Sequence, residues 1–316
     1  MATNIARVAR LLAPVIAQEG EVDTNLGTTK TYWVRKHLLD KPPLVLIHGY
    51  AAGAGCFFRN VQEMAADRAI LMIDIPGFGE SDRPVFTDEP EKDWVAALKH
   101  VFKTEINGPF WLVGHSFGCY LAARMCLEND VNIEGIILLD AWGFKENSLS
   151  FDERLAQMKA WQRGVYHTFK KLKLNGLDAL RMVPKSMGPS LLKRFRGDLR
   201  TFYGDECLEY ICEINSVLPA TGEAAFAELG AGFGYAKYPM GQRLVDNAST
   251  LPTEIHFIYG GKSWVESKTG YKVQSDLLQK HHGINCTVSI VDEAKHHLMV
   301  SHPEEVNQLV NQILSH

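Results

Sequence analysis

Six short apolar runs, separated by helical patterns, constrain the fold of this 316-residue chain more than any other feature. Short runs rich in β-branched residues are typical of strands buried on both faces of a parallel sheet. Helical patterns lie between most of them, around 58–66, 90–104, 117–128, 271–281 and 303–314. The alternation predicts an α/β fold with an open, doubly wound, mostly parallel sheet. The predicted strands are LVLIH (44–48), AILMIDI (69–75), FWLVG (110–114), GIILLD (135–140), EIHFIYG (254–260) and CTVSIVD (286–292).

The domain organisation follows from two segments that do not fit this alternation. More than a hundred residues with helical character separate the fourth and fifth strands, and a structureless loop of that length is implausible in a compact domain. We therefore expect a helical cap at 145–250, inserted into an α/β core of 28–144 and 251–316. Residues 1–27 are predicted to be an N-terminal amphipathic extension that packs on the domain, attaches to a membrane surface or acts as a mitochondrial presequence. Its apolar helical face holds Ile5, Val8, Leu12, Val15 and Ile16.

Charge is distributed unevenly along the chain. Residues 151–200 contain twelve Lys and Arg against four acids, a net charge of +8, while the rest of the chain carries −12. A basic cap suits contact with an anionic head group or surface, although solvated helix faces produce the same composition. The six cysteines show neither metal-like nor disulfide-framework spacing, which favours reduced thiols in a cytoplasmic protein. We expect no cofactor, no metal and no nucleic-acid partner.

The motif that carries chemistry is the pentapeptide 114–118, GHSFG, at the junction of a predicted strand and a predicted helix. Such a tight turn presents its serine in a strained conformation, and Gly114 and Gly118 keep the neighbouring space open. Ser116 is the candidate nucleophile. The backbone N–H groups of Phe117 and Tyr50 are the candidate oxyanion hole, because both lie directly after predicted strands.

A serine nucleophile needs a base and a carboxylate that orients the base. In this type of fold the acid and the histidine follow the serine along the chain. Glu266, just past the strand 254–260, is the predicted acid, and Asp140, at the end of the strand 135–140, is the alternative. His48 lies directly before a glycine-rich turn and is expected to order that loop rather than to act as the base.

The base is expected in the loop before the last helix, where His296 and His297 are adjacent candidates. His302 lies too close to the start of that helix and is expected at the surface. Ser301 and Glu304 have the spacing of a capping box, with Pro303 in the first turn. Ser301 is therefore expected to begin the last helix.

With these residues in view, the chain resembles the α/β-hydrolases over residues 28–312, and within them the branch of α/β-hydrolase domain-containing proteins four and five. That branch includes a lipase of N-acylated ethanolamine phospholipids and lysophospholipids, and a lipid-droplet protein that co-activates a triglyceride lipase. The resemblance is carried, in order along the chain, by LVLIHGYAAGAG, IDIPGFGESDRP, GHSFG, LLDAWGF, LLKRFRGD, TGEAAF, IYGGKSWVES and HHLMVSHPEEVN.

The resemblance implies a serine hydrolase of lipid esters, of the phospholipase or lysophospholipase type, with Ser116, Glu266 and His296 as its triad. The co-activator has asparagine at the serine position, so Ser116 favours an active enzyme over a droplet-associated regulator of another lipase. The third alternative, a lysophosphatidic acid acyltransferase, is linked to an H-x-x-x-x-D pattern in which Ser301 here replaces the aspartate. The implied partners are lipid substrates, a membrane or lipid-droplet surface and another lipase. The implied location is cytoplasmic, peripheral on droplets or intracellular membranes, with mitochondria as the alternative.

Overall fold

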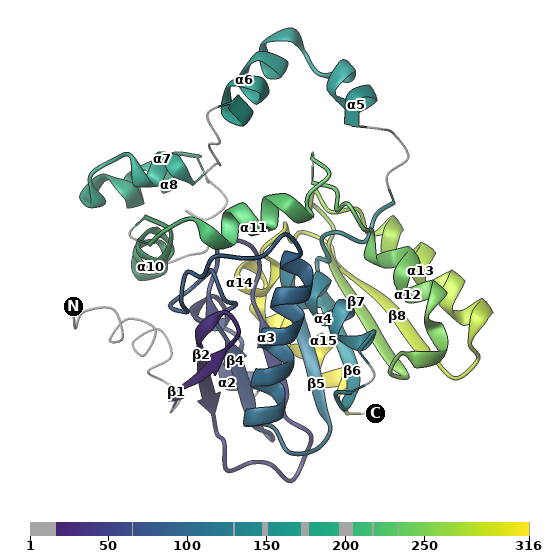
Figure 1. The fold of residues 1–316 in the computed structure, drawn as a ribbon. Helices are drawn as coiled ribbons and strands as arrows, with labels where there is room; N and C mark the ends of the chain where they lie inside the picture. Colours follow the sequence, from purple (N-terminus) through teal and green to yellow (C-terminus); the bar gives the residue numbers. More distant parts are fainter. Residues whose placement is uncertain are drawn as a thin grey trace.

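The structure, a computed structural model, describes residues 17–64, 66–128, 130–146, 151–171, 177–195, 205–216, 218–232 and 234–315 (Figure 1). The predicted amphipathic helix of the first sixteen residues lies outside the described residues. None of the helices in the described part of the chain combines the length and the apolar character needed to cross a bilayer.

An eight-stranded sheet forms the centre of the molecule, with the strands in the order β1-β2-β4-β3-β5-β6-β7-β8. All neighbouring pairs from β4 to β8 are parallel, whereas β1 pairs antiparallel with β2, and β2 with β4. The six predicted strands, and the mostly parallel sheet, are confirmed. The strands are β1 (Ala17–Thr24), β2 (Gly27–Val34), β3 (Leu44–Ile47), β4 (Ile70–Ile73), β5 (Phe110–His115), β6 (Ile133–Leu139), β7 (Glu254–Gly260) and β8 (Asn285–Val291).

The hairpin of β1 and β2 was not predicted, and it corrects the boundary of the N-terminal extension. Residues 17–27, assigned to that extension, instead form an edge strand, a tight turn at 25–26 and the first residue of β2, Gly27, whose φ is +78°. The sequence of β1, AQEGEVDT, is mostly polar, and Val22 is its only described residue in the buried core. An edge strand with one buried residue lacks the apolar run by which the other strands are recognised.

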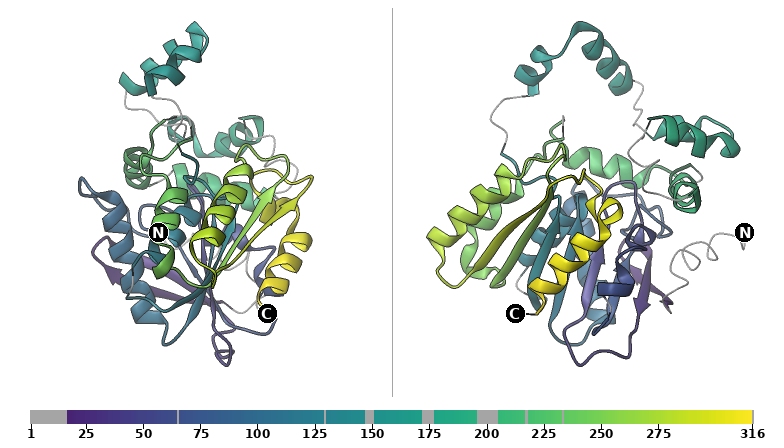
Figure 2. Two further views of the ribbon diagram at one scale, coloured as in Figure 1. Left: turned by 90° about the vertical axis from the view of Figure 1, so that its right-hand side faces the viewer. Right: turned by 180° about the vertical axis from the view of Figure 1, so that it is seen from behind.

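Helices cover both faces of the sheet, as expected for a doubly wound fold (Figures 1 and 2). Alternate side chains of β3 show the two layers: Val45 and Ile47 belong to one buried cluster, Leu44 and Leu46 to the other. The first cluster includes residues of α3 (Pro90–Glu105), α4 (Phe117–Cys126), α12 (Met240–Asp246) and α13 (Lys268–Lys280). The second includes residues of α2 (Val61–Met64), α14 (Leu298–Ser301) and α15 (Pro303–Ile313).

The described part of the insertion between β6 and β7 is helical, as predicted. α7, α8, α10 and α11 lie over the carboxyl ends of the strands, and α5 and α6 stand further out (Figure 1). The predicted limit of the cap at residue 250 is wrong, because α12 packs on α4 and α13 as part of the core. The cap helices are α5 (Phe151–Gln157), α6 (Ala160–Lys171), α7 (Asp178–Arg181), α8 (Gly188–Phe195), α10 (Asp205–Ser216) and α11 (Thr221–Leu229).

The first turn of α4 approaches the backbone at the end of β3 so closely that no side chain fits between them. A Cβ at Gly118 would lie 2.1 Å from the carbonyl oxygen of Ile47 and 2.6 Å from that of His48. These are backbone atoms, which cannot rotate away. Glycine is therefore required at this position for packing.

We predict that Gly118→Ala lowers the free energy of unfolding by about 3 kcal/mol, because the added methyl group overlaps backbone atoms. Urea denaturation followed by circular dichroism measures the effect. Gly164→Ala in α6 is the matched control, since a Cβ there meets nothing within 4 Å. Alanine is also the better helix former, so the control should cause no loss of stability. A Gly118→Ala protein as stable as wild type would contradict the packing argument.

Candidate active site

The carboxyl ends of four parallel strands bring distant segments of the chain to one edge of the sheet. Gly114 of β5 pairs with Leu138 of β6, and Leu139 of β6 pairs with Ile258 of β7. β8 continues the same register beside β7. The loops that follow β5, β6 and β8 carry Ser116, Asp140 and His296, respectively. The sheet register thus places the three residues side by side.

Ser116 occupies a sharp turn between β5 and α4. Its backbone has φ +53° and ψ −111°, a conformation that side chains rarely adopt. The Ser116 N–H donates to the carbonyl of Leu139 at 3.0 Å, which ties the turn to β6. A Cβ at Gly114 would lie 2.6 Å from the backbone nitrogen of Cys119. The crowding explains why small residues flank the serine, as the sequence indicated.

His296 joins Ser116 and Asp140 through its two ring nitrogens. Its Nε2 lies 3.0 Å from Ser116 Oγ, and its Nδ1 lies 2.5 Å from Asp140 Oδ2. A carboxylate accepts only, so Nδ1 carries the proton and Nε2 accepts from the serine hydroxyl. The Asp140 side chain has no exposed surface, and that of His296 is 13% exposed. His297, the alternative base, lines the same cavity, but the hydroxyl of Ser116 is bonded to His296.

The structure contradicts the prediction that Glu266 is the orienting acid. Glu266 is exposed and its Oε1 lies 2.7 Å from Nζ of Lys145. It follows β7 by several residues and lies just before α13. Asp140, the alternative, comes directly after β6, which lies between β5 and β7 in the sheet. Asp140 therefore stays at the strand ends beside Ser116 and His296, whereas the chain after β7 carries Glu266 out to Lys145.

Two donors besides His296 hold the Asp140 carboxylate. The Gly260 N–H donates to Oδ1 at 3.1 Å, and the Ser263 hydroxyl makes a short hydrogen bond to Oδ2. A buried carboxylate is stable only when its oxygens are paired in this way. Sequence reasoning missed Ser263. The signal available was a serine three residues past the end of β7, beside the strand that carries the acid.

His115, the residue before the candidate nucleophile, forms a hydrogen bond with the loop that carries His296. Its Nε2 lies 2.9 Å from the carbonyl oxygen of His296 and donates to it. Its Nδ1 is buried without a hydrogen-bond partner among the described residues. Burial and the nearby His296 lower the pKa of His115 to about 3, so the ring stays neutral at pH 7. Sequence reasoning also missed this residue, which was read only as part of the GHSFG motif.

The candidate oxyanion donors lie on either side of the nucleophile. Phe117 is the first residue of α4, and Tyr50 lines the same cavity as the serine. A Cβ at Gly49 would lie 3.2 Å from Cβ of Ser116, which measures how closely this loop approaches. Asn215 of cap helix α10 donates to the carbonyl of Ala51 at 2.8 Å, so the cap holds the same loop. The oxyanion role of Tyr50 and Phe117 stays a prediction.

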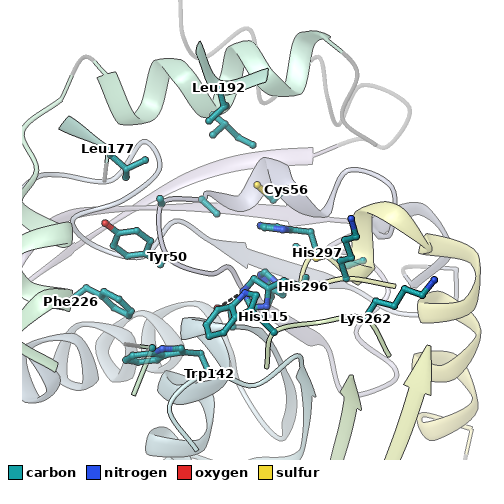
Figure 3. A pocket seen from close by; sticks show the side chains of 18 residues that line it. Tyr50, Cys56, His115, Trp142, Leu177, Leu192, Phe226, Lys262, His296 and His297 are labelled. Carbon is teal, nitrogen blue, oxygen red and sulfur yellow. Dashed lines mark hydrogen bonds between the residues drawn. The ribbon is translucent and has the colours of Figure 1, made fainter. Parts of the chain in front are cut away.

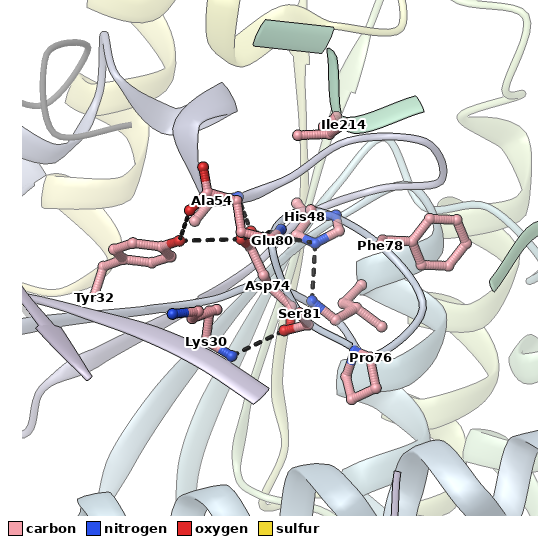
Figure 4. Close-up of polar contacts among 12 residues, drawn as sticks. Lys30, Tyr32, His48, Ala54, Asp74, Pro76, Phe78, Glu80, Ser81 and Ile214 are labelled. Atoms are coloured by element: carbon pink, nitrogen blue, oxygen red, sulfur yellow. Dashed lines mark hydrogen bonds and ion pairs between the residues drawn. The ribbon is translucent and has the colours of Figure 1, made fainter. Parts of the chain in front are cut away.

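A buried polar network also holds the loop that carries Tyr50 (Figure 4). His48 Nε2 accepts the N–H of Ile75 at 2.9 Å, and Nδ1 donates to the carbonyl of Gly49 at 2.8 Å. Burial lowers the pKa of His48, which keeps it neutral. Asp74 accepts the N–H of Ala54 at 2.6 Å. His48 therefore orders the loop, as expected, and is not positioned as the base.

The expected capping box at the last helix does not form. Ser301 is the last residue of α14, and its hydroxyl contacts Nδ1 of His302 at 2.8 Å. His302 is the N-cap of α15, with no side-chain capping bond, and Pro303 occupies the first turn as expected. Because the one-turn helix α14 precedes α15, the N-cap position falls on His302, one residue later than predicted. The spacing of Ser301 and Glu304 therefore does not correspond to a capping box.

Ser116 and His296 open onto a cavity of about 550 Å³ beneath the cap (Figure 3). The cap side of the cavity is apolar, and polar groups gather at the strand ends. The lining residues are Tyr50, Ala51, Ala52, Cys56, His115, Ser116, Trp142, Leu177, Leu192, Ile211, Phe226, Gly234, Lys262, Trp264, Lys295, His296, His297 and Met299.

This sheet order, with a serine at the strand–helix turn and a histidine–aspartate pair beside it, defines the class of α/β-hydrolases. The chain belongs to the alpha/beta hydrolase family, whose model matches residues 44–309. The solved structures that resemble it include a bacterial membrane phospholipase A (TM-score 0.68, 17% identity, 98% of this chain and 90% of that chain). Naproxen esterase from Bacillus subtilis is a second (TM-score 0.65, 16% identity, 99% and 98%). At these identities the likeness shows the fold alone.

Three relatives in sequence are more informative. The protein abhd-5.2 of Caenorhabditis elegans is 34% identical over 85% of this chain, which spans 58% of that relative's length. The mouse (lyso)-N-acylphosphatidylethanolamine lipase is 32% identical, over 87% of this chain and 79% of its own. The rat 1-acylglycerol-3-phosphate O-acyltransferase ABHD5 is 31% identical, over 92% and 82%. The expected branch of the family is thereby confirmed.

We predict that Asp140→Asn lowers kcat for ester hydrolysis by about 10³- to 10⁴-fold, because a neutral amide cannot stabilise the imidazolium and its N–H₂ group favours the tautomer of His296 that lacks a proton on Nδ1. Glu266→Gln is the matched control and should stay within about twofold, since Glu266 contacts Lys145 instead. Steady-state hydrolysis of a p-nitrophenyl ester measures both. The reverse order of effects would restore Glu266 as the acid.

A second prediction concerns Glu80, which shares the hydroxyl of Tyr32 with Asp74. Burial, and then the charge of Asp74, raise the pKa of Glu80 from 4.5 to about 7. The folded state therefore keeps a proton up to about pH 7 that the unfolded chain releases near pH 4.5, so the free energy of unfolding falls as pH rises through this window. Glu80→Gln should reduce that fall by on the order of 1 kcal/mol, after allowance for solvent screening.

Urea denaturation at pH 5 and pH 8 measures this difference for wild type and variant. Glu304→Gln, at an exposed position of α15, is the control and should leave the pH dependence unchanged. An equal pH dependence in wild type and Glu80→Gln would show that Glu80 ionises normally in the folded protein.

Proposed function

We propose that this chain is a serine hydrolase of lipid esters, of the phospholipase or lysophospholipase type. The observation that carries the proposal is the continuous line of hydrogen bonds from Ser116 through His296 to Asp140, at the base of a largely apolar cavity. A buried carboxylate, an oriented imidazole and a turn serine that lines the cavity are the parts that acyl transfer requires.

In the proposed reaction, His296 Nε2 takes the hydroxyl proton as Ser116 Oγ attacks the ester carbonyl. Asp140 stabilises the imidazolium that forms, and the N–H groups of Tyr50 and Phe117 bind the oxyanion. The proton then passes from His296 to the leaving alcohol, which departs and leaves an acyl-serine. Water, deprotonated by the same Nε2, attacks this ester and releases the fatty acid, and Ser116 recovers its proton.

Two observations support a lipid as the acyl donor. The cap side of the cavity is formed by Leu177, Leu192, Ile211 and Phe226, which suit an alkyl chain. Relatives covering most of this chain carry the names (lyso)-N-acylphosphatidylethanolamine lipase and 1-acylglycerol-3-phosphate O-acyltransferase. We infer that the substrate is presented at a membrane or lipid-droplet surface, to which the protein binds peripherally.

The other two functions implied by the family, lipase co-activation and acyl transfer to lysophosphatidic acid, have less support. A co-activator has no need of a hydrogen-bonded serine and histidine, yet both are in contact here. The acyltransferase interpretation calls for a carboxylate where Ser301 stands, and Ser301 bonds to His302. Hydrolysis is the function that the hydrogen bonds from Ser116 through His296 to Asp140 support best.

We predict that Ser116→Ala abolishes labelling by a fluorophosphonate probe and lowers lipid ester hydrolysis by at least about 10⁴-fold. A lysophospholipid and monoacylglycerol panel, read by released fatty acid, gives the rates. His296→Ala should fail in both assays, whereas its neighbour variant His297→Ala should keep labelling. Hydrolysis at the wild-type rate by Ser116→Ala would refute the proposal. Stimulation of a purified triglyceride lipase that survives Ser116→Ala, without intrinsic hydrolysis, would favour the co-activator instead.

A further inference from the structure

We propose that Lys262 and Lys295 form an anion-binding subsite in the catalytic cavity, and that this subsite selects esters whose alcohol part carries a phosphate. The inference rests on the proposed ester hydrolysis, since it concerns the same cavity. In this proposal the residues that bind the anionic group of the substrate are two lysines of the α/β core. They are not part of the basic segment of the cap.

Backbone packing between the loops after β7 and β8 holds the two lysines on one rim. The Lys262 N–H donates to the carbonyl of Ala294 at 2.9 Å. A Cβ at Gly260 would lie 2.5 Å from the carbonyl oxygen of Ala294 and 2.7 Å from that of Lys295, so the loops are in direct contact. Lys295 immediately precedes His296 in sequence. The backbone of both lysines is thus fixed relative to the candidate base, and each side chain extends from that fixed position.

Lys262 and Lys295 give this cavity its charge. Among the described residues that line it, they are the only lysines, no arginine occurs, and none is an aspartate or glutamate. The exposed cationic rim therefore has no carboxylate facing it from the cavity wall. An ammonium group beside a partly dehydrated cavity attracts phosphate more strongly than one on an open surface.

Neither lysine is committed to a strong internal partner. Lys262 pairs with Glu293, but the two side chains are 55% and 70% exposed, and such exposed pairs contribute less than about 1 kcal/mol. Lys295 has no ion pair or side-chain hydrogen bond in the part of the chain that the structure describes. Both side chains are free to turn toward an incoming anion at small cost.

The cavity is polar at one end and apolar at the other. This asymmetry favours one orientation of a bound ester. Figure 3 shows Lys262 on one side of His296, and Leu177 and Phe226 on the opposite side. An ester centred on Ser116 would direct its acyl chain toward the apolar cap side. Its alcohol part then lies toward the lysines, within reach of a phosphate on the glycerol.

The basic cap fits this role less well than its composition suggested. Arg154 donates to the carbonyl of Ala231, Arg163 to those of Ala156 and Met158, and Arg181 bonds to Asp178 and Glu223. These described arginines hold the cap together. None of them lines the cavity, whereas Lys262 and Lys295 do.

The test compares two octanoyl esters that differ only in the phosphate, 1-octanoylglycerol and 1-octanoylglycerol 3-phosphate, kept monomeric so that surface charge plays no part. For wild type we expect a lower KM for the phosphate ester. Lys262→Ala/Lys295→Ala should raise that KM by roughly tenfold, leave kcat within about twofold, and leave both constants for the neutral ester unchanged. Lys41→Ala/Lys92→Ala is the matched control, because it removes the same charge from two exposed lysines that lie outside the cavity.

The outcomes separate the subsite from the proposed reaction. Hydrolysis of both esters with equal KM values, or a preference that survives the double lysine variant, would overturn the subsite and leave ester hydrolysis standing. Hydrolysis of neither ester, together with no hydrolysis of the wider lipid panel, would instead overturn the proposed function. An equal loss in the control variant would assign the effect to net charge and not to these two positions.

Discussion

The arrangement of this site depends on one buried carboxylate. Asp140 has no exposed surface, and an unpaired charge in that position would destabilise the fold by several kcal/mol. Its donors come from two different loops: Gly260 and Ser263 after β7, and His296 after β8. Satisfying the charge therefore fixes the loops that surround it. The requirement that stabilises Asp140 is the same one that orients the imidazole toward Ser116.

Close backbone packing supplies the second constraint. The turn at Ser116 lies under the loop of Gly49 and over the ends of the neighbouring strands, with no space for an added methyl group at Gly114 or Gly118. His115 extends the same packing by donating to the carbonyl of His296. The candidate nucleophile, the candidate oxyanion loop and the loop of His296 are consequently packed in direct contact. Rigid support of this kind is what a preorganised site requires.

The sequence was sufficient for features that depend on local pattern and insufficient for those that depend on position in the sheet. Six buried strands and the turn at Ser116 have apolar and glycine signatures. The edge strand β1 has none, since its side chains are mostly polar. Glu266 and Asp140 both follow strands, and chain order alone cannot say which lies level with His296. Asp140 stays at the end of β6 and reaches His296, whereas Glu266, several residues past β7, pairs with Lys145, and these contacts become visible only in the folded structure.

The charges of the molecule illustrate the same limit. Twelve basic residues in 151–200 dominate the composition, yet three of them, Arg154, Arg163 and Arg181, bond to carbonyls and carboxylates of the cap itself. Lys262 and Lys295 are separated along the chain and carry no signature, but parallel strands β7 and β8 bring them to one rim beside His296. The electrostatic environment of a bound substrate is set by the few charged side chains that line the cavity. The net charge of +8 on residues 151–200 affects how the protein approaches an anionic surface, a long-range effect that salt screens.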